Sequence, residues 1–179
     1  MISSPSTGHA GGSLSSQLIT IRRWFHQHPE LSFEEAGTAR QIITELNHLG
    51  IPVEYRGVGH AVIGRIEGID PSRPAVGLRA EMDALPGNEA TGADYASINT
   101  GKVHACGHDA HMTMVLGAAA LLKANPPPCN VLFVFQPAEE KGGGARTVIN
   151  SGVLDSVKAI FGSHVTHHYR VGEIMVAEG

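Results

Sequence analysis

The beginning of the chain twice places apolar side chains at the spacing of one helix face. The stretch LSSQLITIRRWFHQHPE predicts a first helix, which Pro29 ends. Its apolar positions are Leu18, Ile21, Trp24 and Phe25. The stretch SFEEAGTARQIITELNHLG predicts a second helix, with Ser32 as its N-cap and Glu35 three residues later in a capping box. Gly50 ends this second helix.

Beyond the second helix, apolar runs of strand length alternate with helical patterns. The predicted strands are 52–56, 60–68, 75–83, 130–137, 157–165 and 172–179. The predicted helices are 110–128 and 142–154, and residues 86–102 have the composition of a loop. The first two strands should pair with each other through the turn at Gly57 and Gly59. Strands that alternate with helices predict an α/β layered fold with a largely parallel sheet.

Composition and charge narrow the classes of protein to which the chain can belong. Its 179 residues are 42% hydrophobic and 17% charged, which suits one globular domain with a sizeable core. The net charge of −4, without a basic run, argues against nucleic acid as a partner. No apolar run approaches the length of a membrane span, so we expect no membrane partner. Residues 1–13 lack the features of a signal peptide, and we expect them to form a flexible tail.

A cluster of histidines indicates a metal site. The stretch VHACGHDAH, residues 103–111, contains three of the eleven histidines of the chain. Histidine is the commonest metal ligand in proteins. Cys106 lies inside the cluster, and the two cysteines of the chain are too few for a disulfide framework. This cysteine usage suits a reducing compartment, so we expect a cytoplasmic protein.

Further ligand-type side chains follow the carboxyl ends of three predicted strands. They are Glu81 and Asp83, then Glu139 and Glu140, then His164. Cys106 and His108 directly precede the helix over 110–128. In open α/β sheets, ligands bind beyond the carboxyl ends of the strands, so these segments should meet at one edge of the sheet. A thiolate, imidazoles and carboxylates together suit zinc or a similar first-row ion.

The predicted site suggests hydrolytic chemistry. In an extended segment Cys106 and His108 would face the same way, and the start of the next helix would favour the Cys106 thiolate. Glu139 and Glu140 are neighbours that cannot easily reach one atom, so one can ligate while the other reaches a metal-bound water. Such a water attacks a carbonyl carbon, and the carboxylate hands its proton to the leaving amine.

Each candidate also has an ordinary structural interpretation. His104 and His111 are either ligands or capping and supporting residues, and the neighbouring glutamates could belong to a solvated loop. His164 could be a satisfied core histidine, and Asp83 could cap a turn. The whole cluster could be a structural zinc module, but such sites commonly draw on closely spaced Cys and His pairs. The candidates here are scattered along the sheet edge and include carboxylates, which favours catalysis.

Five motifs together resemble a known family. They are HQHPELSFEE, LRAEMDALP, HACGHDAH, FQPAEEKGGGA and IFGSHV, in the order in which the family has them. The chain resembles the N-acyl-amino-acid amidohydrolases among the dinuclear zinc peptidases, such as hippurate hydrolases and auxin–amino-acid conjugate hydrolases. This resemblance implies a zinc-exopeptidase-like three-layer α/β sandwich. It also implies hydrolysis of an N-acyl amino acid or a small peptide.

The resemblance implies a role for each matching residue. It makes Glu139 the general acid/base, and it makes Asp83 the aspartate that stands beside a ligating histidine in related peptidases. Glu81 occupies that histidine's place, where this branch usually has aspartate. The implied metal ligands are Cys106, His108, Glu140 and His164. Two divalent ions are implied, with zinc the first expectation and manganese, cobalt or nickel as alternatives.

Members of that family are much longer than this chain. They continue into a lid domain that often dimerises, and then return to supply one more histidine ligand. We therefore expect residues 14–179 to be the N-terminal part of a catalytic domain, without the lid. The alternative to an amidohydrolase is an inactive fragment or a metal-binding remnant that lacks the last ligand. An uncovered sheet edge would favour self-association, so a homo-oligomer is also expected.

Overall fold

The computed structural model describes residues 12–56 and 58–176. Its helices are α1 (Leu14–Gln27), α2 (Ala36–His48), the short 3-10 helix η1 (Val58–His60), α3 (His108–Ala124) and α4 (Gly144–Asn150). Its strands are β1 (Val53–Arg56), β2 (Val62–Ile66), β3 (Ala75–Glu81), β4 (Leu85–Pro86), β5 (Lys102–Val103), β6 (Val131–Gln136) and β7 (Val157–Gly162). From α3 onward helices and strands alternate along the chain as the sequence predicts, whereas α1 and α2, and then β2 to β5, follow one another directly.

Five strands form one mixed sheet in the order β1-β2-β6-β3-β7. β2 pairs antiparallel with β1 and with β6, whereas β3 pairs parallel with β6 and with β7. The expected pairing of the first two strands is therefore confirmed, but only half of the sheet is parallel. The predicted loop over 86–102 is also more ordered than expected, because β4 and β5 pair at its two ends.

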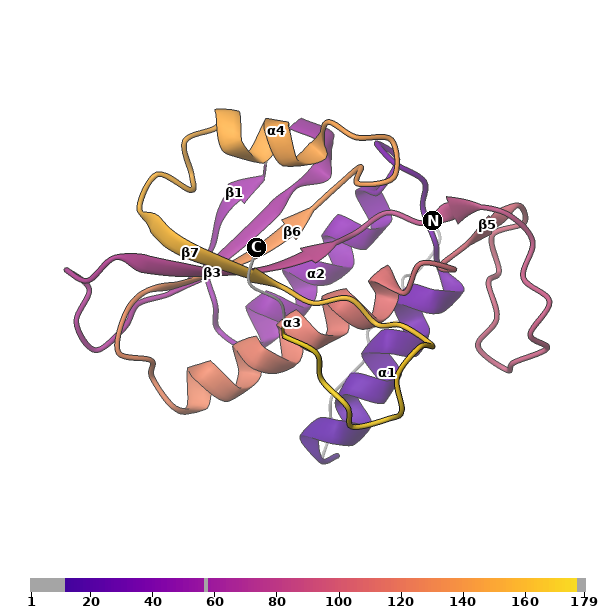
Figure 1. Ribbon diagram of the computed structural model, residues 1–179, viewed down its shortest axis with the longest axis horizontal. Helices are drawn as coiled ribbons and strands as arrows, with labels where there is room; N and C mark the ends of the chain where they lie inside the picture. Colours follow the sequence, from indigo (N-terminus) through magenta and orange to yellow (C-terminus); the bar gives the residue numbers. More distant parts are fainter. Residues whose placement is uncertain (1–11, 57, 177–179) are drawn as a thin grey trace.

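Helices cover both faces of the sheet, which makes three layers (Figure 1). β6 is buried along its whole length, and its side chains alternate between the two faces. Phe133 and Phe135 pack on the side of α1, α2 and α3, whereas Leu132 and Val134 pack on the side of α4. The predicted three-layer α/β sandwich is confirmed.

The start of α2 differs from the predicted capping box. Ser32 does not cap the helix, because its hydroxyl donates a hydrogen bond to the carboxylate of Asp83 at 2.6 Å. Glu30 takes the capping role instead, and its carboxylate accepts from the backbone N–H of Gly37 at 3.0 Å and of Thr38 at 2.7 Å. The local pattern pointed to the wrong residue because Ser32 is engaged by a distant strand end.

The start of α1 limits the predicted tail. The hydroxyl of Ser13 accepts from the backbone N–H of Ser16 at 3.3 Å, so Ser13 caps the helix instead of belonging to a tail. Residues 1–11 lie outside the described part of the chain. None of the helices in the described ranges is long and apolar enough to cross a membrane.

β7 is an edge strand with most of its side chains exposed. Ile160 and Phe161 are 48% and 59% exposed. The strand predicted over 172–179 is wrong for residues 172–176, which form a turn and irregular backbone, and residues 177–179 are not described. The sheet therefore ends at β7 in the described chain, and one apolar edge is left open.

Candidate metal centre

The carboxyl ends of β3 and β6 lie side by side and carry four of the acidic candidates. The two strands are parallel, and Glu81 at the end of β3 pairs with Gln136 at the end of β6. Two residues beyond β3 lies Asp83, and shortly beyond β6 lie Glu139 and Glu140. The sequence prediction that these strand ends meet at one edge is confirmed by the register.

Three of the four predicted ligands form a close group. The donor atoms of Cys106, His108 and Glu140 all lie within 4.8 Å of one another. Nδ1 of His108 lies 2.7 Å from the backbone carbonyl oxygen of Asp83, which makes Nδ1 the protonated nitrogen. Its Nε2 lies 3.9 Å from Oε1 of Glu140. The lone pair of Nε2 is therefore available for a metal on the side of the other donors.

Asp83 is fully buried and holds both glutamates through their backbone. Its carboxylate accepts from the N–H of Glu139 at 3.1 Å and from the N–H of Glu140 at 3.0 Å. Burial raises the pKa of Asp83, but the imidazole of His108, whose Nδ1 lies 3.6 Å from Oδ1, and the hydrogen bonds from Ser32 and these two amides outweigh burial and lower it to about 2. Asp83 is therefore ionised, and it orients three candidate residues at once.

A turn in an unusual backbone conformation directs the two glutamates towards Asp83. Ala138 has a positive φ of 49° and is fully buried. Its N–H donates to Oε1 of Glu35 at 2.8 Å, and Glu35 is itself fully buried. A left-handed alanine costs about 1 kcal/mol, so this contact maintains a conformation that the chain would otherwise avoid. The local pattern predicts a place in a helix cap for Glu35 and contains no signal for this contact with Ala138, which is 103 residues away along the chain.

Cys106 is a protonated thiol in the metal-free protein. Burial raises its pKa first, and the hydrogen bond and charge of Glu140 raise it further, to about 11. Burial and the neighbouring carboxylates therefore outweigh any stabilisation of the thiolate by the start of α3. Cys106 also lies in a turn before α3, not in an extended segment. Its approach to His108 comes from this turn and not from strand alternation.

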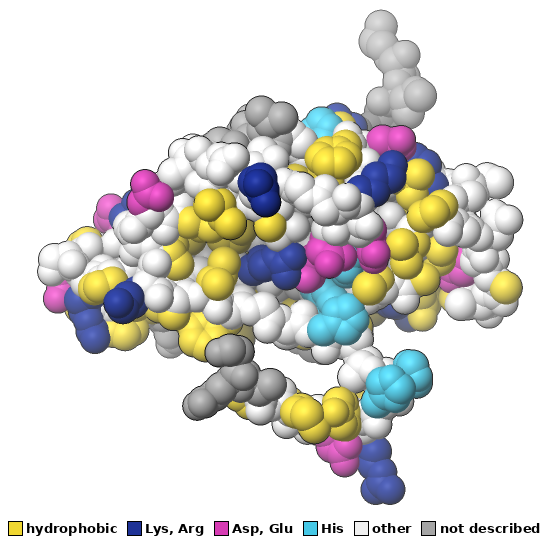
Figure 2. Space-filling model, turned by 45° about the horizontal axis from the view of Figure 1, so that its top comes forward, with side chains coloured by type: hydrophobic (Ala, Val, Ile, Leu, Met, Phe, Trp, Pro, Cys, Tyr) yellow, Lys and Arg dark blue, Asp and Glu magenta, His cyan; other side chains and the backbone are white. Residues whose placement is uncertain are grey.

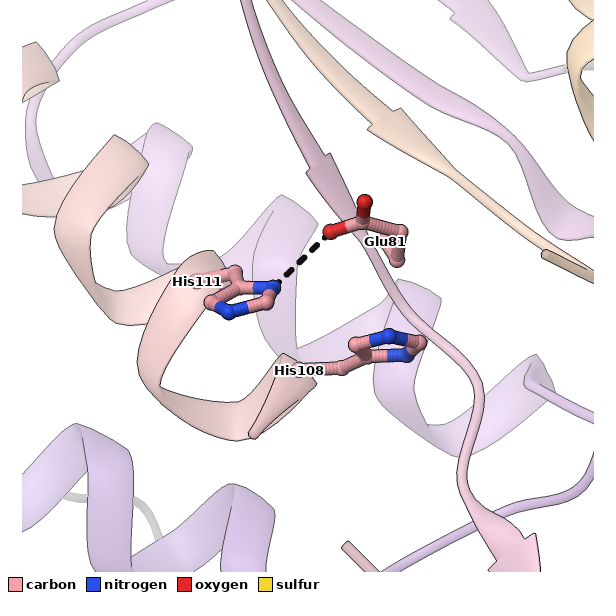
Figure 3. Close-up of side chains that lie close together, drawn as sticks. All are labelled: Glu81, His108 and His111. Carbon is pink, nitrogen blue, oxygen red and sulfur yellow. Dashed lines mark hydrogen bonds and ion pairs between the residues drawn. The ribbon is translucent and has the colours of Figure 1, made fainter. Parts of the chain in front are cut away.

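Glu81, His108 and His111 form a second group of donors within 4.8 Å (Figure 3). Glu81 Oε2 lies 2.9 Å from Nδ1 of His111, and Glu81 Oε1 lies 2.6 Å from Nη1 of Arg79. Burial raises the pKa of Glu81, but His111 and Arg79 outweigh it and lower the pKa to about 2. Both oxygens of the Glu81 carboxylate already have hydrogen-bond partners, so Glu81 needs no metal to satisfy them.

His164, the fourth predicted ligand, is not part of either close group. It is exposed, and its ring lies 4.7 Å from the ring of His111, measured between centroids. The backbone N–H of the next residue, Val165, donates to Nε2 of His111 at 3.0 Å. The structure therefore places His164 at the margin of the site. His111 is hydrogen-bonded to the backbone of the residue that follows it, Val165.

His104 and Asp109 occupy the buried side of the cluster. Neither nitrogen of His104 has a hydrogen-bond partner among the described residues, and burial lowers its pKa to about 4. Asp109 lies 2.7 Å from Nδ1 of His26 and 2.8 Å from Nε of Arg22. His26, from the HQHPE motif, therefore anchors the start of α3 to α1, which sequence spacing alone did not reveal.

Acidic and histidine side chains gather on one face of the molecule (Figure 2). Glu81 and Asp83 each carry a pKa lowered to about 2, so they add negative charge beside Glu139 and Glu140. Burial lowers the pKa of His108, but Asp83 outweighs burial and raises it. A negative charge beside an imidazole favours its protonated, positively charged form. The surroundings therefore favour a cation.

The sequence profile of peptidase family M20/M25/M40 matches residues 77–177. The chain belongs to this family. The matched range contains every predicted site residue, from Asp83 to His164. Membership in the M20 family confirms the resemblance inferred from the five sequence motifs.

Individual relatives agree with this assignment. An IAA-amino acid hydrolase from Arabidopsis thaliana is 44% identical over 164 residues, which are 90% of this chain and 37% of the relative. An N-acetyl-L-cysteine deacetylase from Bacillus subtilis is 44% identical over 169 residues, which are 93% of this chain and 40% of the relative. The chain thus spans about two-fifths of the length of these curated relatives.

A solved M20 structure has the same fold. It is a dinuclear metal-binding peptidase from Bacillus subtilis, with a TM-score of 0.89 and 41% sequence identity. The match covers 93% of this chain and 47% of that chain. The predicted zinc-exopeptidase-like fold class is therefore confirmed.

Proposed function

We propose that this chain is part of a metal-dependent amidohydrolase that cleaves the amide bond of N-acyl amino acids or small peptides. The observation that carries the proposal is the close donor group of Cys106, His108 and Glu140, adjacent to Glu139. The substrate class is supported by relatives named IAA-amino acid hydrolase and N-acetyl-L-cysteine deacetylase. Both names describe hydrolysis of an acylated amino acid.

The chemistry of the donor group fits a divalent cation. Thiolate, imidazole and carboxylate are ligands of zinc, and manganese, cobalt and nickel accept subsets of them. Burial and the nearby carboxylates raise the pKa of the Cys106 thiol, and a cation held beside Glu140 would oppose the effect of these carboxylates and favour the thiolate. We propose Cys106, His108, Glu140 and His164 as ligands of two ions, by analogy with the dinuclear solved relative.

Different residues of this chain have different roles in the proposed hydrolysis. A bound divalent ion lowers the pKa of water and polarises a carbonyl oxygen. Glu139 accepts the proton of the attacking water at its carboxylate and passes it to the nitrogen of the leaving amine. Asp83 keeps Glu139 and Glu140 in place through their backbone N–H groups. Its own carboxylate stays ionised and is not needed as a proton carrier.

A metal-binding remnant without turnover is the second candidate. It is favoured by the position of His164, which is exposed and lies outside the close groups of donors in the described chain. Three close ligands can hold one ion, whereas a two-ion site like that of the dinuclear solved relative needs further ligands. The two free cysteines suit a reducing compartment for either candidate, and we propose a cytoplasmic location.

Metal content measured together with hydrolysis separates the candidates. The chain is reconstituted with zinc or manganese, bound metal is quantified, and N-acetyl and N-benzoyl amino acids are tested as substrates. An amidohydrolase retains its metal in Glu139→Gln but loses turnover by about 10²–10⁴-fold. Glu140→Gln should lose metal, whereas Glu54→Gln serves as the matched control and should change neither, because the Glu54 side chain is exposed on the edge strand β1.

The possible outcomes are distinct. Turnover that depends on Glu139 establishes the first candidate. Bound metal without turnover in the unsubstituted chain establishes the second. A chain that binds neither zinc nor manganese at stoichiometric levels overturns both.

A further inference from the structure

His111 joins three segments of the chain that are distant in sequence. It lies in the first turn of α3 and is 1% exposed. Its Nδ1–H donates to Glu81 at the end of β3, at 2.9 Å. Its Nε2 accepts from the backbone N–H of Val165 beyond β7, at 3.0 Å. A neutral imidazole has one donor and one acceptor, and both are used here.

The orientation of His111 is fixed from the side of the sheet. Glu81 accepts from Arg79 through its other oxygen, and Nε of Arg79 lies 2.8 Å from Oε1 of Gln136 on β6. Because these partners belong to adjacent strands, Glu81 has little freedom to turn away from His111. The carboxylate therefore keeps the proton on Nδ1, and Nε2 stays an acceptor for the amide of Val165.

The backbone at Gly107 also allows the segment that contains Val165 to pack closely against the start of α3. Gly107, directly before α3, has a φ of +87°, and a Cβ at this position would lie 2.4 Å from Cγ2 of Val165. Only glycine therefore allows Val165 to approach the start of α3 this closely. His164, which precedes Val165, has its ring 4.7 Å from the ring of His111.

We propose that His111 is a positioning residue that seats the segment carrying His164 against the start of α3. It does so through its hydrogen bond to the Val165 backbone, with Glu81 fixing its tautomer. His111 is not a metal ligand in this arrangement, because both of its nitrogens are engaged. Its effect on metal binding rests on the proposed function, whereas the docking itself does not.

A matched pair of substitutions separates the two nitrogens of His111. Glutamine places an acceptor near the position of Nε2, whereas asparagine reaches only the position of Nδ1. Amide hydrogen exchange is followed by NMR in the metal-free chain. Loss of one hydrogen bond should speed exchange at Val165 by about three- to tenfold in His111→Asn. His111→Gln should stay within about twofold of the unsubstituted chain.

The interior of α3 reports on folding in the same spectra. Amides such as that of Leu116, which is buried, should keep their protection in both variants. Unchanged exchange at Val165 in His111→Asn overturns the proposal. Equal acceleration in both variants also overturns it, because a loss of packing alone would produce that result.

A size exchange at Gly107 tests the docking without substituting His111, whose Nε2 would be in ordinary contact with the added Cβ at 3.7 Å. Gly107→Ala should displace the segment and speed exchange at Val165, because the added methyl group meets Cγ2. Adding Val165→Ala removes Cγ2 and leaves only the Cβ of residue 165, at an ordinary 3.9 Å. The left-handed φ of residue 107 strains alanine in both variants, so the informative comparison is between them. The double variant should exchange more slowly at residue 165 than Gly107→Ala. Equal exchange in the two contradicts close docking, and this test holds even if His111→Asn does not fold.

Cobalt absorption connects the docking to the metal. If His164 is a ligand, His111→Asn should change the visible spectrum of the cobalt-loaded chain in the same direction as His164→Ala. The double variant should add nothing further, since both substitutions remove the same ligand. A chain that binds no cobalt contradicts the proposed function but leaves the exchange result intact. A cobalt spectrum that responds to His164→Ala but not to His111→Asn overturns the positioning role.

Discussion

His108 is held by the backbone of Asp83, because its Nδ1–H donates to the Asp83 carbonyl oxygen at 2.7 Å. The side chain of the same aspartate accepts from the backbone amides of Glu139 and Glu140. One buried residue thus orients a candidate ligand from α3 and two candidate residues beyond β6. The geometry of the site should therefore be sensitive to Asp83 even though Asp83 is not itself a proposed ligand.

Asp83→Asn is expected to destabilise the metal-free chain by about 1–3 kcal/mol, because an amide cannot satisfy all three donors that face this carboxylate. These donors are Ser32 Oγ and the amides of Glu139 and Glu140. Urea unfolding measures the difference. Asp70→Asn is the control, since the Asp70 carboxylate is exposed and accepts, among the described residues, from Ser72 alone. Equal unfolding free energies for Asp83→Asn and the unsubstituted chain would refute this role.

Asp83 should also make the free energy of unfolding depend on pH in the acid range. Its pKa falls from 3.8 to about 2 on folding, so the unfolded chain takes up a proton first. The stabilisation is complete above pH 4 and is lost as the pH falls from about 4 to 2, with a magnitude of about 2 kcal/mol. Unfolding at pH 5 and pH 3 should show a smaller loss in Asp83→Asn than in the unsubstituted chain. A parallel loss in both would contradict this linkage.

Glu35→Gln is expected to stabilise the chain at neutral pH. Burial raises the pKa of Glu35, and its Oε2 has no partner among the described residues. Glutamine keeps an acceptor for the Ala138 amide but carries no charge, so the cost of burying a carboxylate disappears. The gain in unfolding free energy should grow as the pH rises above 4.5, because a raised pKa means that the folded carboxyl resists ionisation. Glu35→Ala, which loses the acceptor as well, should destabilise instead.

His104 should weaken the fold in mild acid. Burial lowers its pKa from 6.5 to about 4, so between these values the unfolded chain binds a proton that the folded chain excludes. Stability is therefore lost as the pH falls from 6.5 to 4. His104→Phe should remove about 2 kcal/mol of this loss at pH 5. His26→Phe is the contrasting variant, since it loses Asp109 and Glu89 as partners and should destabilise throughout this range.

Cys106 should react slowly with alkylating reagents in the metal-free chain. Its pKa is raised to about 11 by burial and by Glu140, and only the thiolate is nucleophilic. At pH 8, Glu140→Gln should increase the rate of reaction with iodoacetamide several-fold, because it removes the second of these causes. Cys129→Ser is introduced throughout so that one thiol is observed. A rate that does not respond to Glu140→Gln would show that the two side chains do not interact.

β7 is expected to make the chain self-associate. An unpaired, apolar edge strand is a template for pairing with another strand, and lysine on such an edge opposes pairing. Phe161→Lys should therefore lower the apparent mass at high concentration in analytical ultracentrifugation. Ile98→Lys changes a residue that is 64% exposed in the loop between β4 and β5, and should have no effect. A chain that stays monomeric at high concentration would contradict the expectation.

Sequence patterns predicted the elements whose signals are local. α1 follows from its apolar spacing and the following Pro29, and β6 follows from an uninterrupted apolar run. The meeting of the strand ends also followed from sequence, because parallel strands deliver their carboxyl ends to one edge. The strand predicted over 172–179 failed because an apolar run alone does not supply a pairing partner.

The supporting contacts of the site were beyond the reach of sequence patterns. Ser32 has the spacing of a helix cap and yet binds Asp83, and Glu35 binds the amide of Ala138. His111 could be a ligand or a supporting residue until its contacts with Glu81 and Val165 were known. Each of these contacts joins segments far apart in the chain, whereas spacing rules describe only neighbours.

The position of β3 also has a consequence for the order of folding. β3 lies between β6 and β7, and both of these partners follow it only after long intervening segments. Closing such long loops is slow, so the parallel half of the sheet should form late. Cys106 and Glu140 can approach each other only after β3 and β6 have paired. An ion would therefore be captured by a nearly finished sheet, and its binding energy would slow unfolding more than it speeds folding.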